Sequence, residues 1–174
     1  MKVLVTGGAG FIGSHIVERL VRTGYSVNVI DNFITGKQEN LTSDVRLFRV
    51  DITHDKLDFI FHECTPQIVF HQAGQVSVRQ SKNEPGFDAL QNIMGTVRLI
   101  EACKKHEVEK IIYSSSGGAI YGNPLYYPVD ESHPIQPISP YGISKYTAEN
   151  YLRLLLNNSK TNNRKKQDTL PSAK

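Results

Sequence analysis

A glycine-rich stretch near the start of the chain, VTGGAGFIGSH (residues 5–15), joins a short apolar run to a helical pattern. Glycines let the backbone turn with positive φ and approach a pyrophosphate without a Cβ in the way, and the following helix offers unpaired N–H groups and a partial positive charge. The chemistry that this stretch predicts is dinucleotide binding. Two registers fit, G-x-G-x-x-G from Gly8 or G-x-x-G-x-x-G from Gly7, and they share Gly10 and Gly13.

An acidic residue, Asp31, ends the next apolar run, SVNVI (26–30), 18 residues beyond Gly13. Dinucleotide-binding folds place an acid at this point to hold the adenosine ribose hydroxyls, and a carboxylate there repels a 2′-phosphate. We therefore predict NAD as the cofactor. The nearby Lys37 is the residue that would favour NADP instead.

Tyr141 and Lys145 stand four residues apart at the start of a predicted helix, so they share one helix face. This spacing also describes an ordinary pair on a helix surface. A β-rich run ending in SSSGGAIYG (114–122) precedes the pair, and it places hydroxyls at the carboxyl end of a strand, where open α/β sheets bind ligands. The coincidence favours a catalytic role for the pair.

The elements that must position these residues alternate between β-rich runs and longer helical patterns such as residues 11–24 and 87–106. Alternation of this kind, with strands that are apolar almost throughout, is typical of right-handed βαβ crossovers whose sheet is covered by helices on both faces. We predict an α/β fold with a doubly wound parallel sheet of the Rossmann type. The predicted strands are KVLVT (2–6), SVNVI (26–30), RLFRV (46–50), QIVFH (67–71) and KIIYSS (110–115).

A loop rich in proline, residues 122–140, separates the last predicted strand from the last predicted helix. Ser139 can cap that helix with Pro140 in its first position, and the helical pattern continues to about residue 156. Beyond it the sequence is polar and without periodicity. We interpret residues 1–158 as an NAD-binding domain and residues 159–174 as a basic, disordered tail.

The composition indicates an ordinary globular protein, since the 174 residues are 39% hydrophobic and 21% charged. The net charge of +3 resides in the tail, where five basic residues face one acid, so a nucleic-acid partner is not expected. No run is apolar and long enough for a membrane span or a signal peptide. Cys64 and Cys103 lack the spacing of metal ligands, so we predict reduced thiols, no metal site and a cytoplasmic location.

Taken together, these motifs resemble the extended short-chain dehydrogenase/reductases, and within them the NAD-dependent epimerase/dehydratases that act on nucleotide sugars. The resemblance covers residues 1 to about 156. The motifs, in order and at family spacing, are TGGAGFIG (6–13), DN (31–32), DI (51–52), HQAGQVSV (71–78), NIMGT (92–96), SSSGGAIYG (114–122) and SPYGISK (139–145).

The resemblance implies a set of cofactor contacts and the Gly7 register of the glycine loop. Phe11 and Ile12 would flank the pyrophosphate, Asp31 and Asn32 would contact the adenosine ribose, and Asp51 and Ile52 the adenine. Three residues after the fourth strand would line the cofactor, and one would fix the segment that follows them. The implied residues are Gly7, Gly10, Phe11, Ile12, Gly13, Asp31, Asn32, Asp51, Ile52, Ala73, Gly74, Gln75, Asn92, Tyr141 and Lys145.

The implied reaction is 4-epimerisation of a UDP-hexose through transient oxidation at C4. Tyr141 would remove the proton of the C4 hydroxyl, with its pKa lowered by Lys145 and by the nicotinamide charge, and Lys145 would also hold the nicotinamide ribose. Ser116 is the expected hydroxyl partner of Tyr141, with Ser115 as the alternative because the intervening loop departs from the common length. Gly117-Gly118 stands where 4,6-dehydratases carry an Asp-Glu pair, which argues against dehydration.

Members of the family continue with two more strands and a smaller carboxyl-terminal domain that binds the nucleotide part of the substrate, and we expect both to be missing here. Two hypotheses follow: an epimerase that is active at least in a full-length form, or a truncated NAD-binding remnant without turnover. A third is another sugar-nucleotide enzyme of the same family. The resemblance also implies a homodimer formed through the Tyr141 helix and the helix around residues 87–106.

Overall fold

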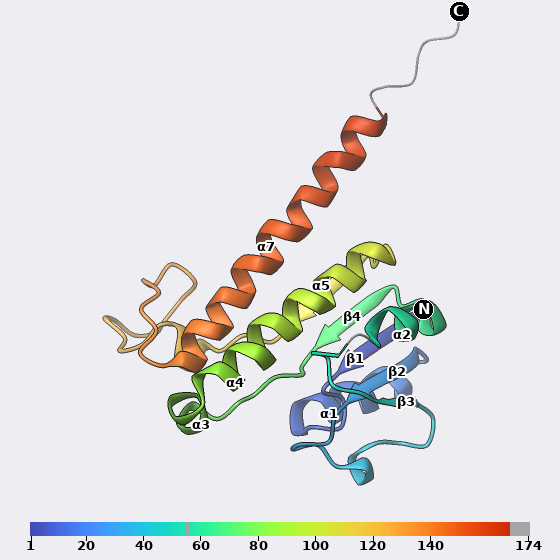
Figure 1. Cartoon of the computed structure of the whole chain (residues 1–174), viewed down its shortest axis with the longest axis horizontal. Helices are drawn as coiled ribbons and strands as arrows, with labels where there is room; N and C mark the ends of the chain where they lie inside the picture. The colour runs from blue at the N-terminus through green and yellow to red at the C-terminus, as the bar shows by residue number, and fades with distance from the viewer. Residues whose placement is uncertain (55, 168–174) are drawn as a thin grey trace, which may run out of the picture.

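The computed structural model describes residues 1–54 and 56–167. In chain order its elements are β1 (Lys2–Thr6), α1 (Phe11–Arg22), β2 (Ser26–Asp31), the 3₁₀ turn η1 (Gln38–Asn40), β3 (Arg46–Arg49), α2 (Leu57–Cys64), β4 (Ile68–His71), α3 (Val78–Asn83), α4 (Pro85–Ala89), the π-helical turn η2 (Leu90–Met94), α5 (Gly95–Lys105), β5 (Lys110–Tyr113), α6 (Gly117–Ile120) and α7 (Pro140–Gln167) (Figure 1).

The five strands form one parallel sheet in the order β3-β2-β1-β4-β5. Chain order therefore reverses between β1 and β4, where Val5 lies opposite Phe70. In a doubly wound sheet the crevice at such a switch point, outside the carboxyl ends of the strands, is where ligands bind. The fold class predicted from the sequence is confirmed.

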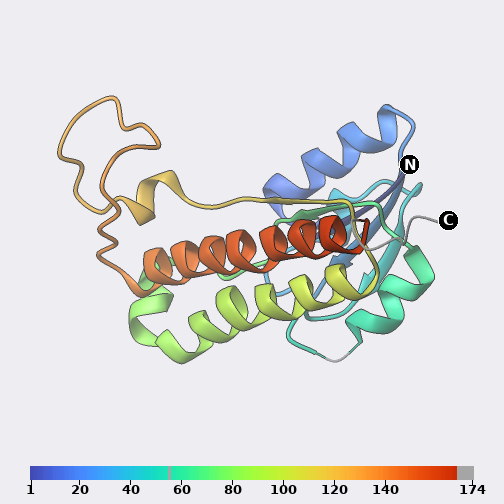
Figure 2. The same cartoon turned by 90° about the horizontal axis from the view of Figure 1, so that it is seen from above.

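Helices cover both faces of the sheet, which explains why the strands are apolar almost throughout. Val3 and Val5 on β1 face α1 and pack with Val17, whereas Leu4 faces the opposite side and packs with residues of α2 and α5. Figure 2 shows α1 on one side of the sheet, with α5 and α7 lying side by side on the other. Each face therefore has its own buried hydrophobic cluster.

The helical pattern predicted over residues 87–106 forms in the structure, but it is not a uniform α-helix. Between α4 and α5 the backbone takes the wider π-helical turn η2, which contains the buried Asn92. Single π turns within α-helices are frequent at functional sites. Hydrophobic periodicity does not distinguish this turn from a regular α-helix, so the sequence did not predict it.

The last helix begins as predicted and ends later than predicted. The N–H of Gly142 donates to Ser139 Oγ at 3.1 Å, so Ser139 caps α7, and Pro140 is its first residue. The predicted end near residue 156 is wrong, because α7 continues as backbone helix to Gln167. Residues 157–167 contain no glycine or proline that would break it. The rest of the predicted tail, residues 168–174, lies outside the described residues.

Among the described residues, no helix combines the length and the apolar character that crossing a membrane requires.

Candidate active site

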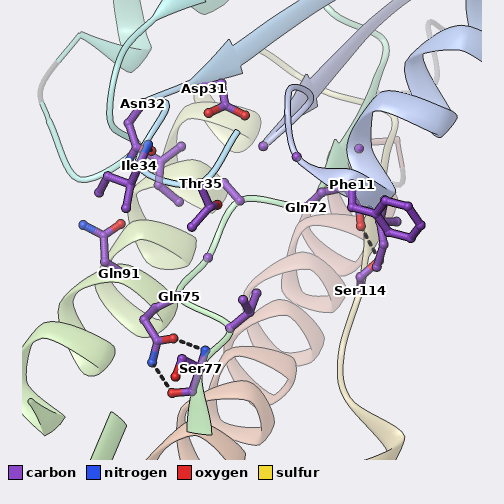
Figure 3. A pocket seen from close by; sticks show the side chains of 18 of the residues that line it. Phe11, Asp31, Asn32, Ile34, Thr35, Gln72, Gln75, Ser77, Gln91 and Ser114 are labelled. Carbon is purple, nitrogen blue, oxygen red and sulfur yellow. Dashed lines mark hydrogen bonds between the residues drawn. The ribbon is translucent and has the colours of Figure 1, made fainter. Parts of the chain in front are cut away.

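A pocket of about 530 Å³ lies outside the carboxyl ends of the strands, at the switch point of the sheet. Figure 3 shows Asp31 and Asn32 at one end of it and Gln75 and Ser77 at the other. Most of the residues predicted to bind the cofactor line it: Gly7, Gly10, Phe11, Ile12, Gly13, Asp31, Asn32, Ile52, Ala73, Gly74, Gln75, Tyr141 and Lys145. Asp51, Asn92 and Ser116 lie outside this lining, whereas Ser115 belongs to it.

The glycine loop meets the pocket in the register that starts at Gly7. Gly7 has φ +67°, and a Cβ there would lie 2.6 Å from the backbone nitrogen of Ala73. A Cβ on Gly13 would collide with the carbonyl oxygen of Gly7. Gly8 faces away from the pocket, since a Cβ there would lie 2.6 Å from the side chain of Val29 in the core. Gly7, Gly10 and Gly13 therefore line the pocket and Gly8 does not, while close contacts leave no room for a side chain at Gly7, Gly8 or Gly13.

Asp31 is fixed at the end of β2 by two backbone donors. Its Oδ2 accepts from the N–H of Ala9 at 2.9 Å and its Oδ1 from the N–H of Phe33 at 2.8 Å. The carboxylate is buried and lines the pocket. The glycine loop is therefore tied directly to the acid that was predicted to contact the adenosine ribose.

Asp51 connects three segments of the pocket wall from behind. It accepts from Asn32 Nδ2 at 2.8 Å, from Gln91 Nε2 at 3.2 Å, and from both the N–H and the hydroxyl of Thr53. Burial works against its ionisation, but these hydrogen bonds outweigh it and hold the pKa of Asp51 below its ordinary value. In this structure Asp51 contacts the wall, and its neighbour Ile52 lines the pocket.

Lys145 is an unusually buried ammonium on α7. Only 8% of it is exposed, and its Nζ lies 4.2 Å from the centroid of the Tyr113 ring on β5. Burial lowers the pKa of Lys145 to about 8, although the charges of Glu149 and Asp88 act in the opposite direction. At neutral pH this side chain places a desolvated positive charge at the edge of the pocket.

Tyr141 lies one helical turn before Lys145 and is half-buried in the same pocket. Burial raises the pKa of its phenol, a hydrogen bond from the Ser116 side chain opposes this, and the charge of Asp88 reinforces it. In the chain alone the net shift is upward because desolvation of the phenol dominates, and the lowering expected from Lys145 together with the nicotinamide charge stays a prediction.

Ser116 is the serine that is hydrogen-bonded to Tyr141. It sits at the amino end of α6, while Ser115 contributes to the pocket lining. The geometry therefore brings Tyr141, Lys145 and Ser116 together from α7 and the segment after β5, and it favours Ser116 over Ser115 as the hydroxyl partner.

Two residues of this site were missed at the level of the sequence. Gln72, at the end of β4, lines the pocket and accepts from the hydroxyl of Ser114 at 2.6 Å, and its buried Nε2 has no hydrogen-bond partner in the part of the chain described. Asp88 is fully buried on α4 and accepts from Gln75 and Asn92. Gln72 stands within the motif HQAG, so its position after a strand was an available signal, whereas a single acid in a helical pattern carries none.

No group of three or more His, Cys, Asp or Glu side chains within residues 1–54 and 56–167 is arranged to hold a metal ion.

The fold and the site define a dinucleotide-binding α/β domain that carries a Tyr-Lys pair beside its cofactor pocket. Residues 3–162 match the sequence model of the NAD dependent epimerase/dehydratase family. With this match over most of its length, the chain belongs to that family.

Two similar proteins carry the name UDP-glucose 4-epimerase, one of them as a putative member. The chain is 46% identical to a putative UDP-glucose 4-epimerase of Methanocaldococcus jannaschii over 152 residues, which are 87% of this chain and 50% of that protein. It is 42% identical to the UDP-glucose 4-epimerase of Mycolicibacterium smegmatis, with 90% and 52% covered. The chain thus spans about half the length of these curated relatives.

Solved structures agree in fold. The UDP-glucose 4-epimerase of Thermotoga maritima, solved with UDP-glucose, superposes with a TM-score of 0.88 at 46% identity, covering 90% of this chain and 52% of that one. The UDP-glucose 4-epimerase of Thermus thermophilus, solved as a complex with NAD, gives 0.86 at 47% identity, covering 88% and 50%.

Proposed function

We propose that this chain is the NAD-binding and proton-transferring part of a nucleotide-sugar 4-epimerase that acts on a UDP-hexose of the UDP-glucose/UDP-galactose type. The observation that carries the proposal is that Tyr141 and Lys145 line the same pocket as the glycine loop, with Ser116 hydrogen-bonded to Tyr141. The relatives named above support the substrate class, since they are UDP-glucose 4-epimerases and one was solved with UDP-glucose.

The residues present fit NAD as the cofactor. Gly7, Gly10 and Gly13 all line the pocket at the amino end of α1, and Gly7 takes φ +67°, a conformation that a side chain would strain. Asp31 supports NAD over NADP, because its buried carboxylate at the end of β2 would repel a 2′-phosphate. The unpartnered Nε2 of Gln72 offers a hydrogen-bond donor at the other side of the pocket, beyond β1. When bound, NAD supplies the hydride acceptor and donor that inversion at a carbinol carbon requires.

Tyr141 would take the proton of the sugar C4 hydroxyl and later return it to the oxygen on the same carbon once its configuration is inverted. Only the phenolate form of Tyr141 can accept that proton, and burial in the chain alone disfavours this form by raising the pKa of the phenol. The Ser116 hydroxyl hydrogen-bonds to this phenol and favours its ionised form. Lys145 contributes a positive charge one turn away and donors for ribose hydroxyls.

A different proposal is that the chain is an NAD-binding module without turnover. It is favoured by the finding that the chain spans only about half the length of its relatives. Incubating the purified chain with NAD and UDP-galactose and assaying for UDP-glucose separates the two. Turnover that disappears in Tyr141→Phe supports the epimerase, whereas NAD binding by calorimetry without turnover supports the module. A chain that fails to bind NAD contradicts both. Formation of reduced cofactor without UDP-glucose would instead indicate another enzyme of the family.

We also propose that the chain forms a homodimer through one face of α4 to α5 and α7. The proposal is supported by exposed apolar side chains on these adjacent helices, among them Leu90, Met94, Tyr151 and Leu154. Sedimentation of the 19.5 kDa chain should show a dimer, and Leu154→Glu should shift it to the monomer. Phe59→Glu, an equally exposed apolar position on α2, is the matched control. A monomeric wild-type chain at high concentration would contradict the proposal.

We further propose a cytoplasmic location, which the free thiols of Cys64 and Cys103 support. Subcellular fractionation of the native host tests it.

A further inference from the structure

Asp88 is a carboxylate with no exposed surface, placed on the short helix α4 behind the pocket. A buried charge of this kind is stable only when its oxygens are hydrogen-bonded. Oδ1 accepts from Gln75 Nε2 at 2.8 Å and from Asn92 Nδ2 at 2.9 Å, and Oδ2 accepts from the hydroxyl of Ser144 at 2.5 Å. The three donors come from three separate segments: the loop after β4, the π turn η2 and helix α7.

Two of these donors hold the wall of the cofactor pocket. Gln75 lines the pocket, and its side-chain amide also donates to the carbonyl of Ser77 at 2.9 Å (Figure 3). Asn92 Nδ2 donates to the backbone carbonyl of Gln75 at 3.0 Å in addition to Asp88. Asp88 therefore fixes the side chain of Gln75 directly and the backbone of Gln75 indirectly, through Asn92.

The third donor lies within the Tyr-Lys pair. Ser144 follows Tyr141 by three residues and precedes Lys145 by one, and it is itself buried. The same stretch of α7 has a second attachment, since the N–H of Tyr141 donates to the buried Ser81 Oγ on α3 at 3.1 Å. The first turn of α7 is thus tied to α3 and α4 through two serine hydroxyls.

The charge of Asp88 also reaches both members of the pair. The groups that face Tyr141 are Ser116 before α6, Tyr113 on β5 and Asp88 on α4, and those that face Lys145 are Glu149 on α7, His71 on β4, Tyr113 and Asp88. The carboxylates among them are Asp88 and Glu149. The negative charge of Asp88 raises the pKa of Tyr141 and that of Lys145.

We propose that Asp88 is a positioning residue for the reaction, which holds the helix of Tyr141 and Lys145 against the Gln75 wall of the cofactor pocket and places a fixed negative charge behind the pair. The role rests on the proposed function, but the contacts that carry it belong to the chain alone.

Two substitutions separate the electrostatic part of this role from the mechanical part. Asp88→Asn keeps the shape, since its oxygen can accept from Gln75 and Asn92 and its amide can donate to the Ser144 oxygen, while the charge is lost. Ser144→Ala keeps the charge and removes the link to α7.

The electrostatic part is tested by carbon-13 NMR titration of the whole chain labelled at tyrosine Cζ and lysine Cε, with assignments from Tyr141→Phe and Lys145→Met. Removing a negative charge favours phenolate and disfavours ammonium, so Asp88→Asn should lower the titration midpoints of both Tyr141 and Lys145 by about half a unit or more. Asp44→Asn removes an exposed carboxylate elsewhere and should move neither midpoint. Unchanged midpoints in folded Asp88→Asn would overturn this part.

The mechanical part is tested by amide hydrogen exchange over the first turns of α7. Ser144→Ala should speed exchange there about tenfold with little change in exchange at β1, and Ser144→Thr, which restores a hydroxyl, should return it toward wild type. Equal exchange in wild type and Ser144→Ala would overturn the positioning role, and this variant still decides if Asp88→Asn does not fold. Neither readout uses NAD or a sugar nucleotide, so a negative epimerase assay and a negative result here are distinguishable.

Discussion

Burial acts on Tyr141 and Lys145 in the same physical sense, because it favours the neutral form of each. It raises the pKa of the phenol and lowers that of the ammonium to about 8. The Ser116 hydroxyl is the group that works against burial at Tyr141. The acid/base character of the pair is therefore set by side chains outside the Y-x-x-x-K spacing, and it can be tested one residue at a time.

Ser116→Ala should raise the pKa of Tyr141, because it removes the hydrogen bond that favours the phenolate. Ser115→Ala is the matched control, since Ser115 is the adjacent hydroxyl and lines the same pocket. Carbon-13 titration of Tyr141 measures both variants, and only Ser116→Ala should move the midpoint. If Ser115→Ala moved it and Ser116→Ala did not, the assignment of the hydroxyl partner would be reversed.

Lys145→Met should stabilise the chain at pH 7 by about 1–3 kcal/mol, because it replaces a desolvated ammonium with an apolar side chain of similar length. The folded-state pKa of Lys145, about 8, lies below the ordinary 10.5, so the unfolded chain binds more protons between these values. Wild-type stability from this group therefore rises as pH increases from 8 to 10.5, and the advantage of the variant should shrink over that range. Urea unfolding at several pH values measures it. A variant less stable than wild type at pH 7 would contradict the prediction.

At the scale of the elements, a directed chain of hydrogen bonds joins β1, β4 and the helix beneath the pocket. The Thr96 hydroxyl donates to the carbonyl of Asn92, so the Thr96 oxygen must accept its second hydrogen bond from His71 Nε2–H. The neutral His71 ring then has a free lone pair on Nδ1, which accepts from the Thr6 hydroxyl. The Thr6 oxygen in turn accepts from the N–H of Ala73 at 3.3 Å. Two residues predicted to serve the cofactor, Ala73 and Asn92, are thus held by the two ends of one network.

Burial, reinforced by the charge of Lys145, lowers the pKa of His71 to about 3. The unfolded chain then binds a proton near pH 6.5 that the folded chain does not, so stability falls as pH decreases from 6.5 toward 3. His71→Gln should remove this dependence, which amounts to about 1.4 kcal/mol per pH unit at most. Urea unfolding between pH 7 and 4 measures the free energy of unfolding of His71→Gln and of the control His62→Gln, which changes an exposed histidine on α2. Equal slopes in His71→Gln and wild type would refute the buried neutral ring.

The elements that follow from local pattern could be predicted from the sequence, and those that depend on tertiary contacts could not. Alternating apolar runs and turn residues predicted the parallel sheet, and the cap at Ser139 predicted the start of α7. The π turn around Asn92 has the same periodicity as an α-helix. Asp88 resembles an exposed helical acid until the fold brings Ser144 to it, 56 residues away along the chain.

At the scale of the whole molecule, this chain contains both sides of the switch-point pocket, although it spans only half of its relatives. β1, β2 and α1 supply the glycine loop and the acid, while β4, β5 and α7 supply Gln72, Ser114 and the Tyr-Lys pair. These elements form one sheet with a buried hydrophobic cluster on each face. NAD should therefore bind the chain on its own, whether or not it turns over a sugar nucleotide.

NAD should raise the thermal unfolding midpoint of the chain progressively with concentration, with stabilisation of about 2.7 kcal/mol when NAD is at a hundred times its dissociation constant. NADP should raise it less at the same concentration, because the buried carboxylate of Asp31 repels the 2′-phosphate. Asp31→Asn removes that repulsion and also one of the two carboxylate oxygens that accept from the N–H groups of Ala9 and Phe33. It should therefore weaken NAD binding and narrow the difference in stabilisation between NAD and NADP.

Lys37→Ala is the opposite control, because it removes the nearby cation that would favour a 2′-phosphate. Equal stabilisation of the wild-type chain by NAD and NADP would show that Asp31 does not select between them, and the choice of cofactor would then have to be assigned to other residues of the pocket.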